Sequence, residues 1–208
     1  MQLLHIVLRE HRQEEAMKNV LFVNRKGGCG KSTICAEVVL SLRRSGIPVN
    51  FYDLDVQGGT ILETGEEPGA KVSAIDTPGA LEDDLAEWIR EADVVVIPTR
   101  PSGLDMESLR FMVRVYEANR KRGACLIIVV NQFTRWSSSR EYLEWVKDEF
   151  GKTAAAITTF MQSEAVIQAS IQDMSVVDFA PRSAAARSAL EVVNVIRRAA
   201  KLPEEQRR

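Results

Sequence analysis

The stretch Asn24 to Thr33 reads Asn-Arg-Lys-Gly-Gly-Cys-Gly-Lys-Ser-Thr, and it follows a short apolar run that begins at Val20. An apolar strand that leads through a glycine-rich turn into a helix is the setting in which such a string forms a phosphate-binding loop. Glycines at 27, 28 and 30 allow backbone N–H groups to face an anion, and the helix that starts at Lys31 adds its positive dipole end. We therefore expect the loop to bind nucleotide phosphates.

Within this loop, Lys31 is expected to reach the β- and γ-phosphates, and Ser32 is expected to ligate magnesium. ATP and Mg²⁺ are therefore the expected cofactors. The residues expected to surround the nucleotide are Gly27, Gly28, Cys29, Gly30, Lys31, Ser32 and Thr33. Cys29 is interpreted as a small filler, and the alternative is a redox-sensitive thiol close to the phosphates.

Short apolar runs alternate with amphipathic helical stretches along most of the chain, which predicts an α/β fold with a mostly parallel sheet flanked by helices. The expected strands are Val20–Asn24, Val49–Asp53, Val72–Ile75, Val94–Pro98, Cys125–Val130, Ala154–Thr158 and Ser175–Val177. The expected helices are Lys31–Ser45, Leu81–Glu91, Asp105–Arg122, Arg140–Phe150, Ser163–Ile171 and Arg182–Ala200.

Length and composition fit one compact domain, because the chain has 208 residues, of which 45% are hydrophobic and 27% charged. A formal net charge of -2 excludes a globally basic nucleic-acid binder but leaves room for a local basic patch. The three cysteines form no Cys-x-x-Cys pair, so neither a zinc site nor a disulfide framework is expected. No apolar run approaches the roughly 20 residues of a membrane-spanning helix. We expect a soluble cytoplasmic protein.

The first 16 residues precede a second methionine, Met17, where the first convincing strand begins. The apolar run Leu3 to Leu8 is too short for a secretory signal and is followed by charged residues in place of a cleavage site. We interpret residues 1–16 as an extension, either an accessory helix or the product of an upstream start, and residues 17–208 as a single P-loop domain.

A lysine early in the loop distinguishes this string from the common P-loop motif. Lys26 precedes the glycines in the pattern Lys-Gly-Gly-x-Gly-Lys-Ser/Thr, and Arg25 stands where the common motif has glycine. This pattern resembles the deviant Walker A motif of the ParA/MinD family of P-loop ATPases. The resemblance implies a SIMIBI-type P-loop NTPase fold and a homodimer in which Lys26 reaches the nucleotide of the partner subunit. Such a cation would stabilise transition-state charge, as an arginine finger does.

Two further motifs lie at strand ends, where open α/β sheets bind their ligands. Asp53-Leu-Asp-Val-Gln-Gly resembles the family's Asp-x-Asp-Pro-Gln-Gly, and Ile75-Asp-Thr-Pro-Gly resembles its Asp-Thr-Pro-Pro. The resemblance implies that Asp55 orients the attacking water, that Asp76 holds magnesium as the Walker B carboxylate, and that Asp53 contacts the metal through water. Val56 and Gly79 depart from the family's prolines without removing a catalytic side chain.

The resemblance extends further along the chain, from about Met17 to Ala200, and is closest to short ParA partition proteins of the ParF kind. Pro98-Thr-Arg-Pro-Ser-Gly-Leu-Asp resembles the family's Pro-x-x-Pro-x-x-Leu-Asp segment. Asn131 occupies the place of an adenine-contacting asparagine, although an Asn that ends a strand is as often only a cap or turn residue.

The ParA resemblance implies a dimer that forms on ATP, binds DNA without sequence preference, and positions plasmid, chromosome or protein cargo. It also implies a ParB-like or cargo adaptor protein that stimulates hydrolysis, and association with the nucleoid. Basic residues on or beside the last helix are the candidate phosphate contacts, and a solvated helix face is the alternative. They are Arg182, Arg187, Arg197, Arg198 and Lys201.

Two alternative functions use the same fold. A MinD-like membrane-cycling ATPase would need a basic amphipathic tail, and Leu202 is the only aliphatic residue between Lys201 and Arg208. No membrane partner is therefore expected. A nucleotide-dependent metabolic enzyme is the other alternative, and Lys26 together with the Asp53 motif argues against it.

Overall fold

A sheet of six parallel strands forms the centre of the molecule, in the order β2-β3-β1-β4-β5-β6. This computed structural model describes residues 17–55, 62–79 and 82–206, so the extension 1–16 lies outside the described residues. The strands are β1 (Lys18–Phe22), β2 (Asn50–Asp53), β3 (Val72–Asp76), β4 (Val94–Thr99), β5 (Cys125–Phe133) and β6 (Ala156–Met161). The predicted α/β fold with a parallel sheet is confirmed.

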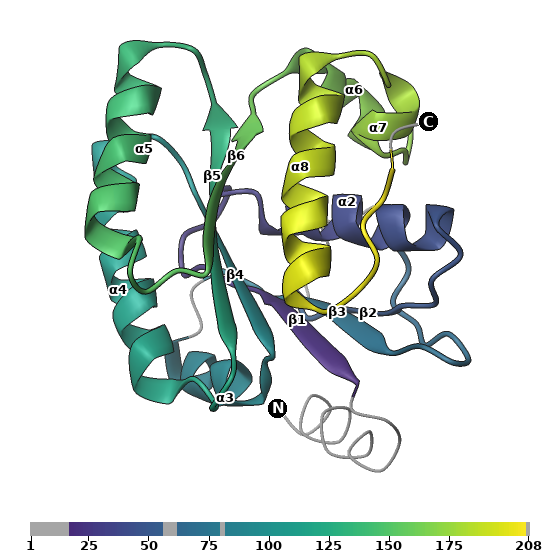
Figure 1. Cartoon of the computed structure of the whole chain (residues 1–208), viewed down its shortest axis with the longest axis horizontal. Coiled ribbons are helices and arrows are strands. Elements are labelled where there is room, and N and C mark those ends of the chain that lie inside the picture. The colour runs from purple at the N-terminus through teal and green to yellow at the C-terminus, as the bar shows by residue number, and fades with distance from the viewer. Residues whose placement is uncertain (1–16, 56–61, 80–81, 207–208) are drawn as a thin grey trace.

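Helices cover both faces of this sheet (Figure 1). One layer contains α2 (Lys31–Arg44), α6 (Glu164–Ile171), α7 (Val176–Phe179) and α8 (Ala184–Ala199). The other layer contains α3 (Glu82–Glu91), α4 (Gly103–Asn119) and α5 (Ser137–Phe150). Among the described residues, no helix combines the length and apolar character that crossing a membrane requires.

Successive side chains of each buried strand point to opposite faces of the sheet and so contribute to two apolar cores. In β1, Val20 and Phe22 face the layer of α2 and α8, whereas Leu21 faces the layer of α3 and α4. All three side chains are at most 1% exposed. Such strands read as continuous apolar runs because both faces of a parallel sheet are covered.

The position of β1 explains where a ligand can bind. This strand pairs with β3 on one side and with β4 on the other, so the chain leaves β1 at the point where the order of strands along the sheet changes direction. In open α/β sheets, the crevice outside the carboxyl ends of the strands at such a point is the usual ligand site.

One predicted strand is wrong. Ser175–Val177 begins the short helix α7, and the Ser175 side chain caps that helix by accepting a hydrogen bond from the Val177 N–H at 3.1 Å. The buried carboxylate of Glu37 on α2 accepts hydrogen bonds from the Ser175 hydroxyl at 2.6 Å and the Val176 N–H at 2.8 Å. These tertiary contacts fix a helix start in a run whose β-branched residues favoured a strand.

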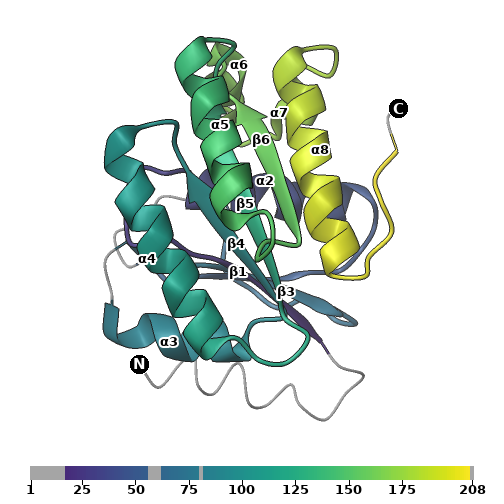
Figure 2. The same cartoon turned by 60° about the vertical axis from the view of Figure 1, so that its left-hand side comes forward.

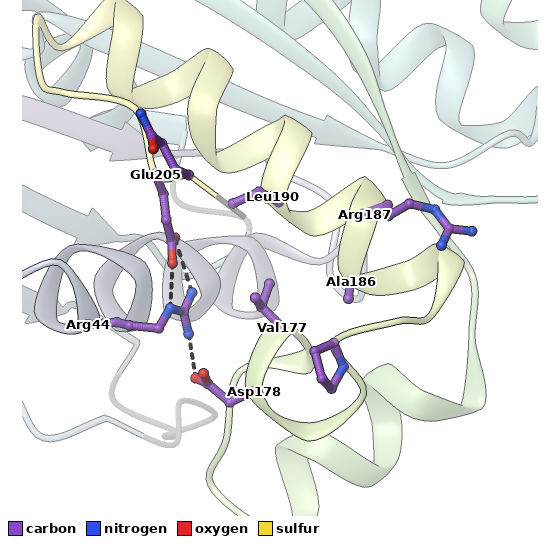
Figure 3. A pocket seen from close by; sticks show the side chains of 9 residues that line it. Arg44, Val177, Asp178, Ala186, Arg187, Leu190 and Glu205 are labelled. Carbon is purple, nitrogen blue, oxygen red and sulfur yellow. Dashed lines mark hydrogen bonds and ion pairs between the residues drawn. The ribbon is translucent and has the colours of Figure 1, made fainter. Parts of the chain in front are cut away.

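The segment after α8, residues 201–206 and here called the tail, folds back along that helix toward α2 in both views (Figures 1 and 2). Glu205 accepts hydrogen bonds from Arg44 Nε at 2.5 Å and from Ser41 Oγ at 2.5 Å. Asp178, on α7, forms an ion pair with the same arginine (Figure 3). Leu202 packs against the apolar core beneath. The tail, α7 and α8 border a cavity of about 180 Å³.

Candidate nucleotide-binding site

The glycine-rich loop connects β1 to α2 at the carboxyl edge of the sheet, as the sequence predicts. Lys31 is the first residue of α2 and is only 7% exposed. Cys29 is fully buried, and burial raises the pKa of its thiol although Lys31 lowers it. A protonated, enclosed thiol agrees with the interpretation of Cys29 as a filler.

Gly30 and Asn131 form a close contact that fixes the end of the loop. Gly30 precedes α2 with a φ of 100°, a conformation that favours glycine. Asn131 Nδ2 donates a hydrogen bond to the Cys29 carbonyl at 2.8 Å, and a Cβ at position 30 would lie 1.9 Å from that nitrogen. Asn131 lies inside β5 and braces the loop; its predicted contact with adenine stays a prediction.

Asn24, which sequence reasoning did not assign to the site, shapes the start of the loop. The side chain is 2% exposed and its Nδ2 donates to the Pro98 carbonyl at 2.7 Å. Its Oδ1 accepts from the Lys26 N–H at 3.0 Å and from Ser108 Oγ on α4 at 3.1 Å. An amide directly after a buried strand was the available signal, because a buried polar side chain needs several partners.

Asp76 ends β3 directly beside the loop, since it pairs in register with Phe22 of β1 and with Asp53 of β2. It is 1% exposed, and neither carboxylate oxygen has a hydrogen-bond partner among the described residues. Burial raises its pKa from the ordinary value of 3.8 to about 6; the charge of Asp53 adds to this shift and that of Lys31 opposes it. A buried carboxylate without a partner calls for a ligand.

A magnesium ion fits this carboxylate. The Ser32 hydroxyl in the first turn of α2 is close enough to lower the pKa of Asp76, yet it does not meet the geometry of a hydrogen bond. Mg²⁺ is usually held by one or two carboxylates together with substrate phosphates and water. No cluster of three or more acidic, His or Cys side chains that could hold a metal ion occurs in the part of the chain that the structure describes.

Asp53 ends β2, and Asp55 lies on the turn that follows it. The Leu54 N–H donates to the Asp76 carbonyl at 2.9 Å, so the turn after β2 is attached to the end of β3. The Asp55 N–H donates to Asp53 Oδ1 at 2.9 Å. The structure thus brings the three predicted acidic residues to one edge, and residues 56–61 of the same motif lie outside the described residues.

Lys26 pairs with Asp105, which is in the first turn of α4 and is 2% exposed. Arg100, after β4, donates to the same carboxylate through Nε at 2.9 Å and through its backbone N–H at 3.1 Å. Its Nη1 would lie 3.7 Å from a Cβ at Gly28. Arg100 is a cation at the loop that sequence reasoning missed, because the Pro-x-x-Pro-x-x-Leu-Asp pattern leaves its position unspecified.

The predicted DNA-contacting residues divide into two groups. The exposed residues are Arg182, Arg187, Arg198 and Lys201. Arg197, by contrast, is 1% exposed, and its guanidinium donates to Ser41 Oγ at 2.9 Å and to the Pro203 carbonyl at 2.6 Å. The prediction for Arg197 is wrong because this side chain points into the space between α8, α2 and the tail.

The fold and the site together define a P-loop nucleotide-binding protein in which a buried carboxylate is available for magnesium. The model of the CobQ/CobB/MinD/ParA nucleotide-binding domain matches residues 20–176. The chain therefore belongs to the ParA/MinD family.

Individual relatives agree with this assignment. Maintenance of carboxysome distribution protein A of Halothiobacillus neapolitanus is 25% identical over 203 residues, which cover 83% of this chain and 91% of that protein. The ATP complex of a Cyanothece McdA variant superposes with a TM-score of 0.72 at 16% identity, over 92% of this chain and 99% of that chain. The Mg-ADP complex of the septum site-determining protein MinD from Pyrococcus horikoshii gives a TM-score of 0.64 at 12% identity, over 86% of this chain and 96% of that chain.

Proposed function

We propose that this chain is an ATP-driven positioning protein that dimerises on ATP and hydrolyses it with Mg²⁺. The observation that carries the proposal is the buried Asp76 carboxylate, which has no hydrogen-bond partner among the described residues and lies beside the phosphate-binding loop. The names of the similar proteins support a role in positioning, and two of the similar structures contain ATP or Mg-ADP.

The residues around the loop have separate roles in nucleotide binding and hydrolysis. Lys31 and the loop N–H groups bind the phosphates, and Ser32 and Asp76 hold Mg²⁺, with Asp53 acting through water. When bound, Mg²⁺ neutralises charge that develops on the phosphate oxygens. Asp55 orients the attacking water.

Lys26 is the residue on which the proposed dimer depends. The side chain is not needed to hold the phosphates of its own subunit, a task for which Lys31 suffices. In a dimer closed on ATP, a cation from one subunit stabilises transition-state charge in the other. Hydrolysis then shifts the equilibrium toward the open form, because the nucleotide state sets the balance between open and closed forms.

Nucleoid DNA is the proposed surface on which the dimer positions its cargo, and an adaptor protein is the proposed activator of hydrolysis. Arg182 lies just before α8, Arg187 near its start and Arg198 at its end, and all three are exposed. Contacts from these residues to phosphates would bind DNA without sequence preference. A membrane-cycling function has less support, because Leu202 in the tail packs against the core of the domain.

An ATPase assay on the purified chain, with and without Mg²⁺ and DNA, tests the enzymatic part. We expect Mg²⁺-dependent turnover that Lys31→Ala abolishes together with nucleotide binding, whereas Asp55→Ala removes turnover and keeps binding. Absence of both binding and turnover in the unmodified chain would refute the proposal.

A salt series of DNA binding tests the positioning surface. With ATP, Asp55→Ala should bind DNA, and log affinity should fall linearly with log salt. Each substitution of Arg182, Arg187 or Arg198 by alanine removes that arginine from both subunits of the dimer, so it should reduce the magnitude of the slope by about 2. Binding of anionic vesicles without any binding of DNA would favour the membrane function instead.

A further inference from the structure

A pocket lies between α7, the start of α8 and the tail, on the other side of α2 from the phosphate-binding loop (Figure 3). Four of its nine lining residues are apolar, and they are Val177, Pro181, Ala186 and Leu190. Its volume is about 180 Å³. Because an apolar cavity of about 150 Å³ is large enough to hold benzene, the pocket can accept an apolar side chain of the size of leucine or phenylalanine.

One end of the pocket carries two carboxylates around the Arg44 guanidinium. Glu205 accepts from Arg44 Nε at 2.5 Å and Nη2 at 3.1 Å and lies 3.7 Å from Arg197 Nη1, whereas Asp178 contacts only Arg44 Nη1. The Glu205 side chain is 10% exposed and that of Asp178 is 45% exposed. Since a carboxylate has about four acceptor positions, Asp178 can still accept a hydrogen bond from a cation outside the domain.

The pocket therefore suits an occupant that has an apolar group next to a positive charge. The apolar group would leave water as it packs against Val177 and Leu190. The positive charge would pair with Asp178 at the edge. Two adjacent residues of a peptide supply both groups, whereas duplex DNA presents phosphates, which the carboxylates of Asp178 and Glu205 repel.

The wall of this pocket is attached to the helix that begins at the phosphate-binding loop. Lys31 is the first residue of α2 and Arg44 the last, so this helix of 14 residues extends for about 21 Å from the loop to the pocket. Between them, Glu37 accepts hydrogen bonds from the Ser175 hydroxyl at 2.6 Å and the Val176 N–H at 2.8 Å. Since α7 is held to α2 at both Glu37 and Arg44, a segment that binds against α7 acts on the helix that carries Lys31.

We propose that this pocket is the docking site for a segment of the adaptor protein in which an apolar side chain stands next to a lysine or arginine. The inference rests on the proposed function, because that function supplies the adaptor. The apolar side chain enters between Val177 and Leu190, the basic residue pairs with Asp178, and α7 transmits the contact to α2.

A set of capped tetrapeptides tests the pocket directly. Their form is Gly-X-Z-Gly, with Leu, Ile, Met or Phe at X and Lys or Arg at Z, and each is titrated into the full isotope-labelled chain without nucleotide while NMR follows the backbone amides. The peptides that bind best should shift amides of α7 and the start of α8 saturably, together with amides in the first turn of α2. Serine at X or glutamate at Z should weaken this binding. If no peptide of the set shifts α7 and α8 saturably, the docking site is overturned, and shifts without any change in α2 overturn the link to the loop.

Three substitutions locate the binding. Leu190→Trp fills the pocket and should abolish the shifts, and Asp178→Asn should weaken the basic peptides by about two- to fivefold, as expected for a partly exposed ion pair. Glu204→Gln is the matched control, because Glu204 is an exposed carboxylate of the tail that pairs with Arg198 and does not line the pocket. Urea midpoints show whether each variant keeps its fold. Equal weakening by Asp178→Asn and Glu204→Gln would indicate a general charge effect and overturn the site.

Sedimentation of the nucleotide-free chain distinguishes a second copy from an adaptor as the occupant. We expect a monomer, and a dimer that Leu190→Trp converts to a monomer would assign the pocket to a second copy and overturn the proposal. Peptide binding is measured without ATP, so its absence leaves the proposed ATPase function intact. If the peptides bind but the chain neither binds nor hydrolyses ATP, the proposed function fails and the assignment of the pocket to an adaptor fails with it.

Discussion

Replacing Asp76 with asparagine should stabilise the nucleotide-free chain at neutral pH while it removes magnesium-dependent activity. In the folded chain, burial raises the pKa of Asp76 from 3.8 to about 6. Because the folded pKa is the higher one, the stability that this group contributes is complete below 3.8 and is lost as the pH rises toward 6. The interval spans about two pH units at about 1.4 kcal/mol each, so the charged group costs about 3 kcal/mol above pH 6.

Urea unfolding of the nucleotide-free wild type and Asp76→Asn between about pH 4.5 and 7.5 measures this effect. The advantage of the variant in free energy of unfolding should grow by about 2 kcal/mol across that range. The new amide can also change the free energy of unfolding by an amount that is the same at every pH, and such an amount does not alter this growth. Asp93→Asn is a control of opposite sign: burial of Asp93 raises its pKa, but contacts from Asn19, Lys18 and Lys121 lower it overall, so its removal should destabilise.

Addition of Mg-ATP should reverse the order of the two chains. A ligand that binds only the folded state stabilises it according to its concentration relative to its dissociation constant, and the variant lacks a carboxylate for the metal. An advantage of Asp76→Asn that stays constant or shrinks as the pH rises would refute the assignment of an uncompensated buried charge.

Two further substitutions test the loop and the tail. Gly30→Ala should abolish nucleotide binding, because the added Cβ would meet Asn131 Nδ2 at 1.9 Å and the φ of 100° is unfavourable for alanine; isothermal titration with ATP checks this, and wild-type affinity would contradict it. Arg197→Ala should cost about 3 kcal/mol in urea unfolding, since it removes the charged hydrogen bonds that the buried guanidinium donates to Ser41 Oγ and to the Pro203 carbonyl. The exposed Arg198→Ala should cost at most about 1 kcal/mol, and equal losses would contradict the burial of Arg197.

The sequence predicted those features of the site that are written in local patterns. Glycines before Lys31 at the end of an apolar run were sufficient to locate the phosphate loop, and aspartates at strand ends indicated the edge where Asp76 and Asp53 meet. Parallel strands bring their carboxyl ends to one edge, so residues distant in sequence become neighbours there. The fold class also followed from a local pattern, the alternation of apolar runs and amphipathic stretches.

What the sequence missed depends on tertiary contacts. Arg197 has the charge and helical position of a surface residue, and only the return of the tail toward Ser41 encloses it. Arg100 stands at an unspecified position of the Pro-x-x-Pro-x-x-Leu-Asp segment, so its place beside the loop appeared only with the fold. The sequence predicted that Asn131 contacts adenine, whereas the fold shows that its side chain donates a hydrogen bond to the Cys29 carbonyl of the loop.

Sedimentation of the Asp55→Ala chain with and without Mg-ATP tests the central claim most directly. The account predicts a monomer without nucleotide and a dimer at saturating Mg-ATP, because Asp55 is assigned to hydrolysis and not to nucleotide binding or closure. A chain that binds ATP yet sediments as a monomer at every nucleotide concentration would contradict the proposal of a nucleotide-driven dimeric switch.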